Sequence, residues 1–568
     1  MLRSIEFAPD SKSPMNCESQ RKARHRDLAP WRLACAALFA AALLAACGKP
    51  EPTGSGIAPL DAKPVAGGEL VFAFDGAAVT AFGLDPHRSA FAPHHRIIRS
   101  LFDSLVVLQP GGKVGPWLAK SWEVSANGLT YTFQLRDDVV FHDGSKLDAA
   151  AVKFNFDRIQ DPKNALIALS DLGTYASSEV VATHTLRVRL SAPFAPFLAN
   201  LSKSTLGIVS PAAVTLHGDK FLLNPVGSGP FKFVSLQAGT EIALARHESY
   251  HWAPAGSANI GPAYLDKLTF KNVPEEATRV AVLANGQVGA SDIIPPQNLL
   301  ALRKDPQVRI VQGELLNHNY SLYLNTGREP WTDASVRRAF KLALDIDTAV
   351  KTVHLGTLAR AWAPLSPSIP GYDARFENSW KPDRAESARL LDAAGWKPGK
   401  DGIRQKDGKR LTLVFLDTQG NREKRLDLLT VFRRQLADAG FELRIDSLSS
   451  GQYLERSAAG DYDLLGGSLF APDSDVLRRI HSPLLRSRSS VSKINDPALE
   501  DLLQAGAREL DPAKRWPLYS QAQQRILDQT YSIPIYVLIY FIATNAKVEG
   551  VQIDAHGFPV FYNAWIRT

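Results

Sequence analysis

The segment from Leu411 to Leu448 predicts a β-strand, an α-helix and a second β-strand in direct succession. "LTLVFLDT" (Leu411–Thr418) is mostly apolar, and "FELRIDSL" (Phe441–Leu448) alternates apolar with polar residues. Between them, "REKRLDLLTVFRRQLADAG" repeats apolar residues at helical spacing and ends on Gly440, a residue typical of helix C-termini. Two strands joined by one helix are expected to be parallel, because parallel strands need a crossover connection. This part of the chain is therefore expected to form an α/β domain.

The stretch "GLTYTFQLRDDVVFHDGSKLDAAAVKFNFDRI" predicts strands followed by a helix. Apolar and polar residues alternate in Thr130–Leu135, and Asn127-Gly128 and Asp143-Gly144 are turn dipeptides. Asp148 precedes a run with helical spacing that ends at Ile159, so we expect it to cap that helix. With 568 residues, 45% of them hydrophobic, the chain has enough apolar material for two or three domains.

A strongly apolar segment, "IPIYVLIYFIATNA" (Ile533–Ala546), lies near the C-terminus. It is shorter than the ~18 apolar residues that a membrane-spanning helix needs. We therefore interpret it as a pair of buried strands.

The N-terminal part of the chain has the order of an export signal. Basic side chains precede the apolar run Leu33–Ala46, which is too short to span a membrane and has the length of a secretory apolar region. The alternative, a spanning helix, is disfavoured by that length. Gly48–Pro64 is rich in Pro and Gly, as flexible tethers are. We expect residues 1–46 to be a signal peptide and residues 47–65 to be a tether.

All three cysteines, Cys17, Cys35 and Cys47, lie at the start of the chain, which excludes a disulfide framework. "LAAC", which ends on Cys47, resembles a bacterial lipobox, in which the cysteine becomes the first mature residue and carries diacylglycerol. The resemblance implies that Cys47 is a lipid attachment site that tethers the protein to a membrane in the periplasm, with each buried CH2 contributing ~0.8 kcal/mol. A start at Met15 instead of Met1 would give a leader of more usual length.

The charge of the chain does not indicate a nucleic-acid partner. The formal net charge is +7, but seven basic and four acidic residues lie in residues 1–46. The remainder has only a small positive balance, whereas nucleic-acid binders concentrate positive charge on one face. We expect no nucleic acid to bind.

A possible zinc motif, "HESYH" (His247–His251), matches H-E-x-x-H. On a helix, His247 and His251 would share one face as zinc ligands and Glu248 would act as a base, so a zinc-dependent hydrolase is an alternative function. The preceding "TEIALAR" alternates as a strand does, and Pro254 follows, so we expect a strand end and a turn instead. The chain has neither G-x-S-x-G nor G-x-x-x-x-G-K-[ST]. We expect no catalytic residues, no metal and no cofactor.

A set of ordered segments carries a resemblance to a known family. The segment from Gly128 to Ile159 is similar to the signature of family 5 of the extracellular solute-binding proteins of ABC importers, which serves dipeptides, oligopeptides, opines and nickel chelates. The likeness recurs, in order, over Gly67–Arg567 in "GGELVFAF", "LDPHR", "GPWLAKSWEVS", "NPVGSGPFKFV", "GYDARF", "YDLLGGS" and "YSIPIYVLIYFIA".

This resemblance implies an α/β fold of the periplasmic-binding-protein type II, with two lobes that close over a ligand at a hinge, plus an extra domain. Lobe I would combine residues 66–110, 226–317 and 541–568, the extra domain would be residues 111–225, and lobe II would be residues 318–540. The resemblance further implies a monomeric receptor, not an enzyme, that passes a small solute to an ABC permease in the inner membrane. Peptides are the leading ligand class, and an opine or a nickel or other metal chelate is the alternative.

The resemblance also implies which side chains line the cleft, where aromatic walls and a few polar groups are useful. In this sequence the family positions fall on Tyr320, Tyr323, Trp362, Ser468, Phe470 and Asp473, with His87 and Phe91 on the opposite wall. The alternative is that Tyr323 and Trp362 belong to the core and that Asp473 caps a helix.

One departure from the family pattern concerns the ligand. Many peptide-binding relatives place an Asp in the loop after this Tyr-Asp-Leu, where it pairs with the peptide α-amine, but the position falls near Leu469 here. A peptide N-terminus would then have to reach Asp473 or Asp475, because a buried ammonium without a partner is costly. This departure weakens the peptide hypothesis relative to an opine or a chelate.

Overall fold

The structure is a computed structural model that describes residues 63–567, except residues 77–78, 80–82, 89–91, 165, 314–315, 419–420 and 486–491. The predicted signal peptide, most of the tether, Cys47 and Phe91 lie outside the described residues. In the part that the structure describes, every helix is too short or too polar to cross a lipid bilayer.

Lobe I is built on a seven-stranded sheet whose central strand is β1. This strand is parallel to β10 and to β11, and Phe72 and Phe74 are buried in its centre. Helices α3 (Ala92–Leu101), α8 (Glu276–Ala284) and α9 (Pro296–Leu302) belong to the same lobe. The strands in order are β12 (Val308–Gly313), β21 (Tyr540–Asn545), β11 (Ala290–Asp292), β1 (Glu69–Phe74), β10 (Lys267–Asn272), β9 (Glu241–Arg246) and β8 (Phe231–Gln237).

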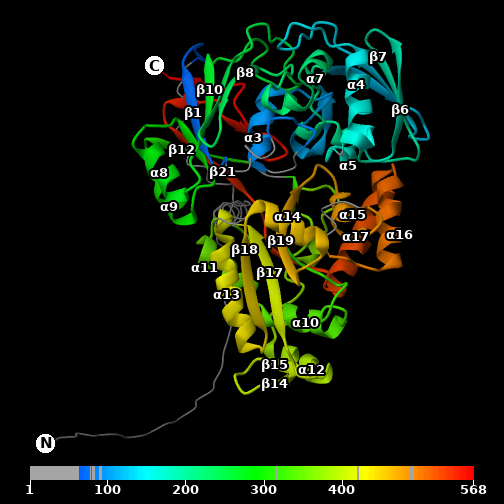
Figure 1. Cartoon of the computed structure of the whole chain (residues 1–568), viewed down its shortest axis with the longest axis vertical. Coiled ribbons are helices and arrows are strands. Elements are labelled where there is room, and N and C mark those ends of the chain that lie inside the picture. The colour runs from blue at the N-terminus through cyan, green and yellow to red at the C-terminus, as the bar shows by residue number, and fades with distance from the viewer. Residues whose placement is uncertain are drawn as a thin grey trace, which may run out of the picture. The chain divides into compact units, whose positions relative to one another are not determined.

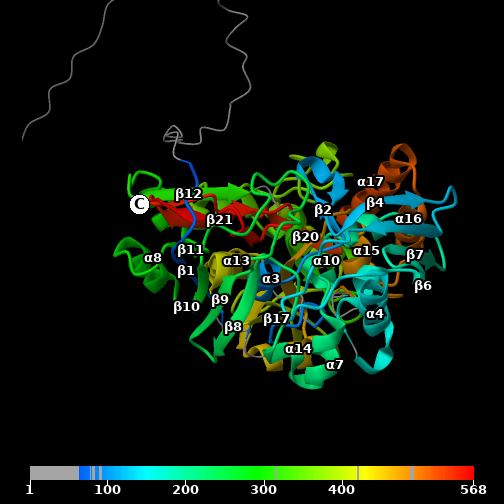
Figure 2. The ribbon, with the colours of Figure 1, turned by 90° about the horizontal axis from the view of Figure 1, so that it is seen from above.

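The extra domain is built on a four-stranded antiparallel sheet and is continuous with lobe I. One hydrophobic core runs from Phe72 in the seven-stranded sheet through Ile98 of α3 to Phe133 and Val188 in the four-stranded sheet. The two sheets lie on opposite sides of α3 (Figures 1 and 2). The strands in order are β4 (Ala119–Val124), β5 (Thr130–Leu135), β7 (Thr185–Leu190) and β6 (Tyr175–Ala182), and the helices are α4 (Ala149–Gln160), α5 (Leu169–Leu172), α6 (Phe197–Asn200) and α7 (Pro211–His217).

The local predictions for this domain are confirmed. Strand β5 covers Thr130–Leu135, and its residues alternate between buried and more exposed. Helix α4 begins at Ala149, and the Asp148 carboxylate accepts a hydrogen bond from the backbone N–H of Ala151 at 2.8 Å. A short antiparallel pair, β2 (Val106–Leu108) with β3 (Val114–Pro116), lies where the chain passes from lobe I into this domain.

Lobe II is built on a five-stranded sheet with a second hydrophobic core. Strand β17 is parallel to β18 and to β19, so the predicted strand–helix–strand unit is confirmed. The strands in order are β18 (Glu442–Leu448), β17 (Thr412–Thr418), β19 (Leu464–Phe470), β13 (Asn317–Leu324) and β20 (Ser532–Tyr536). The helices are α10 (Ala334–Ala343), α11 (Ile346–His354), α12 (Arg384–Ala393), α13 (Arg425–Asp438), α14 (Ser450–Ala459), α15 (Val476–His481), α16 (Pro497–Arg508) and α17 (Pro512–Asp528).

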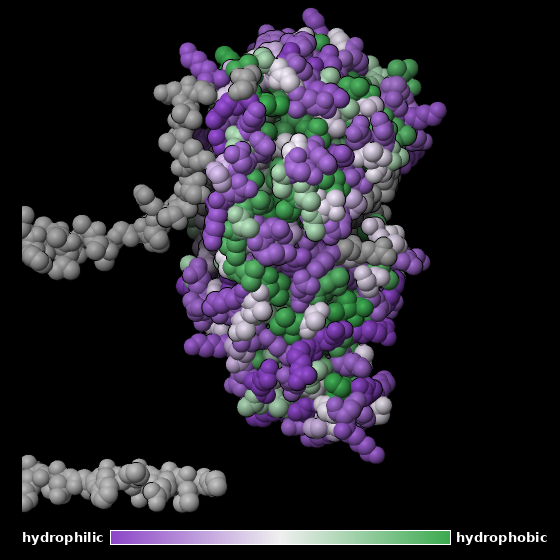
Figure 3. Space-filling model, turned by 90° about the vertical axis from the view of Figure 1, so that its left-hand side faces the viewer, coloured by the Kyte–Doolittle hydropathy of each residue, from purple (hydrophilic) through white to green (hydrophobic). Residues whose placement is uncertain are grey.

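Smaller strands complete the fold. They are β14 (Lys397–Pro398), β15 (Arg404–Lys406) and β16 (Lys409–Arg410) in one sheet, and the pairs β22 (Val548–Glu549) with β25 (Trp565–Ile566) and β23 (Gln552–Ile553) with β24 (Pro559–Val560). On the face shown in Figure 3, polar side chains are interspersed with smaller groups of apolar ones.

The chain passes between the two large sheets at two places. One is between β12 and β13, and the other is between β20 and β21. The segment Ile533–Ala546 thus does contain two strands, as predicted, but they belong to different sheets because the chain crosses from lobe II to lobe I between Tyr536 and Tyr540. These two crossings are where a hinge can bend.

Candidate ligand-binding site

A cavity of about 340 Å³ lies between the two lobes. Lobe I contributes residues of α3, the extra domain and the C-terminal segment, including His95, Lys203 and Phe558. Lobe II contributes the end of β17, the start of α13, the strand β19 and Arg479 of α15. Ligands of open α/β sheets bind at the carboxyl ends of the parallel strands, and the ends of β17 and β19 are in this wall.

The carboxylates that line the cavity differ in their partners. Asp171 accepts hydrogen bonds from Lys203 at 2.7 Å, from Thr205 at 2.6 Å and from Arg479 at 2.9 Å. Burial alone would raise the pKa of Asp171, but the charges of Lys203 and Arg479 hold it at about 2. Asp171 is therefore an anion that two cations share.

Asp417, the second of these carboxylates, has no comparable partner. Its Oδ2 is buried and makes no hydrogen bond within the described residues. Burial raises the pKa of Asp417, although the charges of Arg425 and Arg422 oppose the shift. The third carboxylate, Glu423, pairs with Arg425 at 2.8 Å. Asp417 is thus the lining carboxylate that lacks an ion pair in the part of the chain that the structure describes.

The cavity lining carries more cations than carboxylates. Arg96 is neutralised by Asp292 at 2.8 Å, and Arg425 is neutralised by Glu423. Lys203 and Arg479 share one carboxylate, and burial lowers the pKa of Lys203 to about 8, with the charge of Arg479 adding to the effect. The lining is therefore suited to a solute that carries negative charge.

Ion pairs join the two lobes around the cavity. Arg479 of lobe II reaches Asp171 of lobe I at 2.9 Å, and Lys424 of lobe II reaches Glu276 of lobe I at 2.9 Å. Phe470 of β19 packs on Phe558 of lobe I with ring centroids 4.9 Å apart. The lobes are thus in contact on more than one side of the cavity, as in a closed binding protein.

Of the residues predicted to bind ligand, Ser468 and Phe470 line this cavity. Both are half-buried on β19. Tyr320 and Tyr323 are buried behind the wall instead: Tyr320 stacks on Tyr536 at 4.7 Å, and the Tyr323 hydroxyl donates to the carbonyl oxygen of Gly467 at 3.2 Å. They support the strand that carries Ser468 and Phe470.

Two other predicted residues lie away from the cavity lining. Trp362 packs against Arg360, whose guanidinium carbon lies 4.6 Å from the ring centroid. His87 is fully buried, its Nε2 hydrogen-bonds to the carbonyl oxygen of Gly207 at 3.0 Å, and burial lowers its pKa to about 4. Both side chains already have partners in the protein interior.

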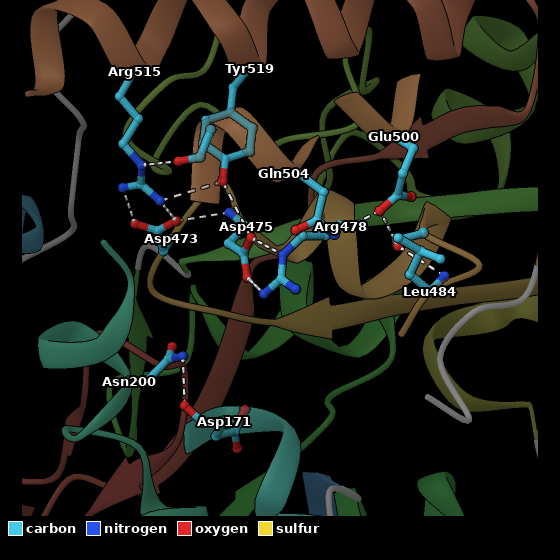
Figure 4. Close-up of polar contacts among 12 residues, drawn as sticks. Asp171, Asn200, Asp473, Asp475, Arg478, Leu484, Glu500, Gln504, Arg515 and Tyr519 are labelled. Carbon is cyan, nitrogen blue, oxygen red and sulfur yellow. Dashed lines mark hydrogen bonds and ion pairs between the residues drawn. The ribbon is translucent and has the colours of Figure 1, made fainter. Parts of the chain in front are cut away.

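Asp473 is held by a buried arginine. Arg515 donates to both of its carboxylate oxygens, at 2.7 and 2.6 Å, as Figure 4 shows. Asp475 is likewise paired with Arg478, at 2.6 and 2.7 Å. Neither carboxylate lines the cavity, so the two positions suggested by the sequence for a ligand amine are occupied by internal ion pairs.

The segment His247–His251 follows strand β9 as a turn, as predicted. His247 is buried and its Nδ1 hydrogen-bonds to the carbonyl oxygen of Gly229, whereas the side chain of His251 is exposed. Other side chains of this turn hold it in the interior. Trp252 donates to the Asp103 carboxylate at 2.9 Å, and Tyr250 donates to it at 3.4 Å. The two imidazoles therefore do not share a helix face, and the segment is a structural turn whose side chains pack in the interior of lobe I.

Sequence reasoning missed the acidic and basic residues that line the cavity, which are Arg96, Asp171, Lys203, Asp417, Arg422, Glu423, Arg425 and Arg479. A signal existed for Asp417, because it is at the carboxyl end of a predicted parallel strand. Lys203 and Arg479 gave no signal, since they come from short, irregular parts of the chain that meet only in the fold.

Two α/β lobes with a charged cavity between them form the architecture that solute-binding receptors use. The chain belongs to the bacterial extracellular solute-binding proteins, family 5, whose model matches residues 113–483. Proteins of this family bind small solutes and work with ABC permeases. The family and the type II fold expected from the sequence are thereby confirmed.

Known relatives bind different solutes. The glutathione-binding protein GsiB of Pectobacterium atrosepticum is 27% identical over 491 residues, covering 85% of this chain and 90% of that protein. The periplasmic binding protein DppA of Helicobacter pylori, solved with the peptide STSA, is 26% identical, has a TM-score of 0.77 and covers 89% of this chain and 99% of that chain. NikA of Brucella suis, solved with Fe(III)-EDTA, is 25% identical, with a TM-score of 0.76 and 88% and 100% coverage.

Proposed function

We propose that the protein is a lipid-anchored receptor of an ABC importer that captures short peptides in the periplasm and delivers them to a permease in the inner membrane. It acts as a monomer and catalyses no reaction. The observation that carries this proposal is the cavity between the lobes, whose wall combines surplus positive charge with one carboxylate, Asp417, that has no ion pair within the described residues. Such a wall complements a solute that bears both an ammonium group and a carboxylate.

The size of the cavity favours a small solute. Its volume of about 340 Å³ is at the lower end of the ~300–1,000 Å³ range of small-molecule pockets. A peptide of two or three residues suits this space better than a long one. Among the relatives, GsiB is a glutathione-binding protein, so glutathione is the first candidate to test.

An opine or a metal chelate is the second candidate. The surplus of cations in the lining also suits a solute with several carboxylates, and the imidazoles of His95 and His556 border the same cavity. NikA, a relative of similar fold, was solved with such a chelate, Fe(III)-EDTA.

The proposed lobe boundaries follow the sequence expectation: residues 66–110, 226–317 and 541–568 for lobe I, residues 111–225 for the extra domain and residues 318–540 for lobe II. The membership of the three large sheets supports these boundaries, since the strands of each sheet fall in one of these sets, apart from single residues at the ends of β13 and β21. The lobes close by bending at the two crossings, and ligand favours the closed form through contacts made only there.

The residues proposed to touch the ligand are Ser468 and Phe470 from the sequence prediction, and Asp417, Lys203 and Arg479 from the structure. Tyr320 acts indirectly, because its hydroxyl lies against Gly466, where a Cβ atom would approach it to 2.2 Å. This contact keeps β19 in place at the cavity wall.

Mass spectrometry of the solute that co-purifies with the protein tests the proposed function. The chain from Gly48 onward, made without its lipid anchor in a bacterial periplasm, is sprayed first intact and then after denaturation. We expect the intact protein to carry extra mass that denaturation releases as short peptides. A single opine-like mass or a metal-bearing adduct would instead establish the second candidate.

The lipid anchor is proposed from "LAAC", which ends at Cys47. We expect Cys47→Ala to release the protein from the membrane fraction into the soluble periplasmic fraction, because stable anchoring then lacks its acyl chains. Fractionation of cells expressing either form, with Cys35→Ala as the matched control, measures the effect. Membrane association that is unchanged in Cys47→Ala would contradict the anchor.

A further inference from the structure

Asp417 is a buried carboxylate that has no ion-pair partner among the residues that the structure describes. The residue is 9% exposed, it lies near the end of β17, and it lines the cavity between the lobes. Its Oδ2 has no hydrogen-bond partner within the described residues. Burial raises the pKa of Asp417 and outweighs the charges of Arg425 and Arg422 and a backbone hydrogen bond to Thr418, which favour the ionised form. A cation brought by the ligand would therefore stabilise the ionised carboxylate.

The neighbouring cations do not satisfy Asp417. Arg425 is held by Glu423 at 2.8 Å and stacks over the ring of Tyr320, with its guanidinium carbon 4.7 Å from the ring centroid. Arg422 lies 3.8 Å from Asp75 of lobe I. In the described structure neither guanidinium comes within ion-pair distance of Asp417, so no side chain among the described residues neutralises this cavity-lining carboxylate directly.

The opposite imbalance exists where Lys203 meets Arg479. Two cations share the single carboxylate of Asp171, and Nε of Arg479 is buried without a hydrogen-bond partner among the described residues. Lys203 belongs to lobe I and Arg479 to lobe II, so an anion bound here would contact both lobes. Ser204 and His95, whose side chains hydrogen-bond to each other at 2.8 Å, also line the cavity.

We propose that the cavity binds a zwitterionic solute in one fixed direction, with its ammonium group on Asp417 and its carboxylate on Lys203 and Arg479. This assignment rests on the proposed function and specifies the ligand as an unblocked short peptide. The reverse direction would place like charges together at both ends, which is destabilising in a poorly hydrated site. The ligand then links β17 of lobe II to the extra domain of lobe I, and its binding favours closure.

The assignment is tested with two probes, glutathione and trialanine, each offered unblocked, N-acetylated and as the C-terminal amide. Isothermal titration calorimetry at pH 7 compares the ligand-free wild type with Asp417→Asn and Lys203→Gln. Asp401→Asn serves as the matched control, because Asp401 is an exposed carboxylate of lobe II that pairs with Arg410 outside the cavity.

We expect the wild type to bind at least one unblocked probe, and to bind its N-acetylated form about 30-fold or more weakly, since acetylation removes one partner of a buried charge pair and leaves the other unpaired. Asp417→Asn should weaken binding of the unblocked probe by a similar factor but should leave the affinity for the N-acetylated form unchanged. Lys203→Gln should weaken binding of the unblocked probe and should have less effect on the affinity for the C-terminal amide. Asp401→Asn should bind as the wild type does.

The outcomes separate the two levels of the proposal. If the wild type binds no unblocked probe, the proposed function fails and the assignment fails with it. If the wild type binds unblocked and N-acetylated probes equally well, or Asp417→Asn weakens both equally, the function stands and the assignment is overturned. Urea denaturation of the ligand-free variants controls for folding, and Asp417→Asn should not lower the midpoint, because it removes an unpaired buried charge. The wild-type comparison of the probes decides the assignment even if a variant does not fold.

Discussion

Replacing Gly227 by alanine is expected to lower the free energy of unfolding by about 3 kcal/mol or more. A Cβ atom at this position would lie 2.1 Å from the carbonyl oxygen of Leu101 and 2.5 Å from the Phe102 ring. The clash is with backbone at the end of α3, which cannot rotate away as a flexible side chain can. Nearby backbone hydrogen bonds, from Gly229 to Leu101 at 2.9 Å and from His142 to Gly227 at 2.8 Å, would be disturbed as well.

Urea denaturation followed by tryptophan fluorescence measures this loss, and Gly451→Ala is the matched control. Gly451 lies in the first turn of α14, and a Cβ atom there would meet nothing within 4 Å. Alanine favours a helix over glycine by up to ~1 kcal/mol, so the control should be neutral or slightly stabilising. Equal stability of Gly227→Ala and the wild type would show that α3 and the segment after Val226 are not packed as described.

The segments "NPVGSGPFKFV" and "HESYH" can be recognised in the sequence, although neither contributes a residue to the cavity lining. The Ser228 hydroxyl and the Trp252 indole both donate to the Asp103 carboxylate, each at 2.9 Å. Burial raises the pKa of Asp103 to about 7, and these hydrogen bonds oppose the shift. The His247 imidazole of the second segment hydrogen-bonds to the carbonyl oxygen of Gly229 in the first at 3.1 Å, so the two segments meet in the interior of lobe I.

The parts of the fold that sequence predicted correctly are those that local patterns determine. Strand β5, the Asp148 cap of α4 and the parallel pair β17 and β18 each depend on residues close together in the chain. Helix α13 begins at Arg425, later than the pattern suggested, because Glu423 and Lys424 adopt left-handed backbone conformations. Helical spacing gives no information about such a local departure.

The candidate site was less predictable, because it depends on which charges find partners after folding. Asp473 and Asp417 are both carboxylates that follow or end a strand of lobe II. Only the three-dimensional structure reveals that Arg515, far along the chain, neutralises Asp473, whereas Asp417 has no such partner among the described residues. Ser468 and Phe470 were identified because the family pattern places their strand at the cavity.

The pair Asp473 and Arg515 leads to the second large expected effect. Arg515→Met should lower the free energy of unfolding by about 3–5 kcal/mol, because it leaves the buried carboxylate of Asp473 without its bidentate partner. Burial alone would lower the pKa of Arg515, but the charge of Asp473 and the hydrogen bonds to it raise it. Asp473→Asn should be destabilising for the same reason, and the double variant should lose less stability than the sum of the single ones.

Arg375→Met is the matched control for this pair, since Arg375 also binds an aspartate, Asp373, but its own side chain is 79% exposed. Water and salt screen an exposed pair, so the control should lose much less stability than Arg515→Met. Because Asp473 is occupied by Arg515 and does not line the cavity, Asp473→Asn should bind peptide with wild-type affinity at a temperature where it is folded. A folded Asp473→Asn variant that keeps its stability but no longer binds peptide would show that Asp473 contacts the ligand. Arg515 would then have to release the carboxylate when ligand enters.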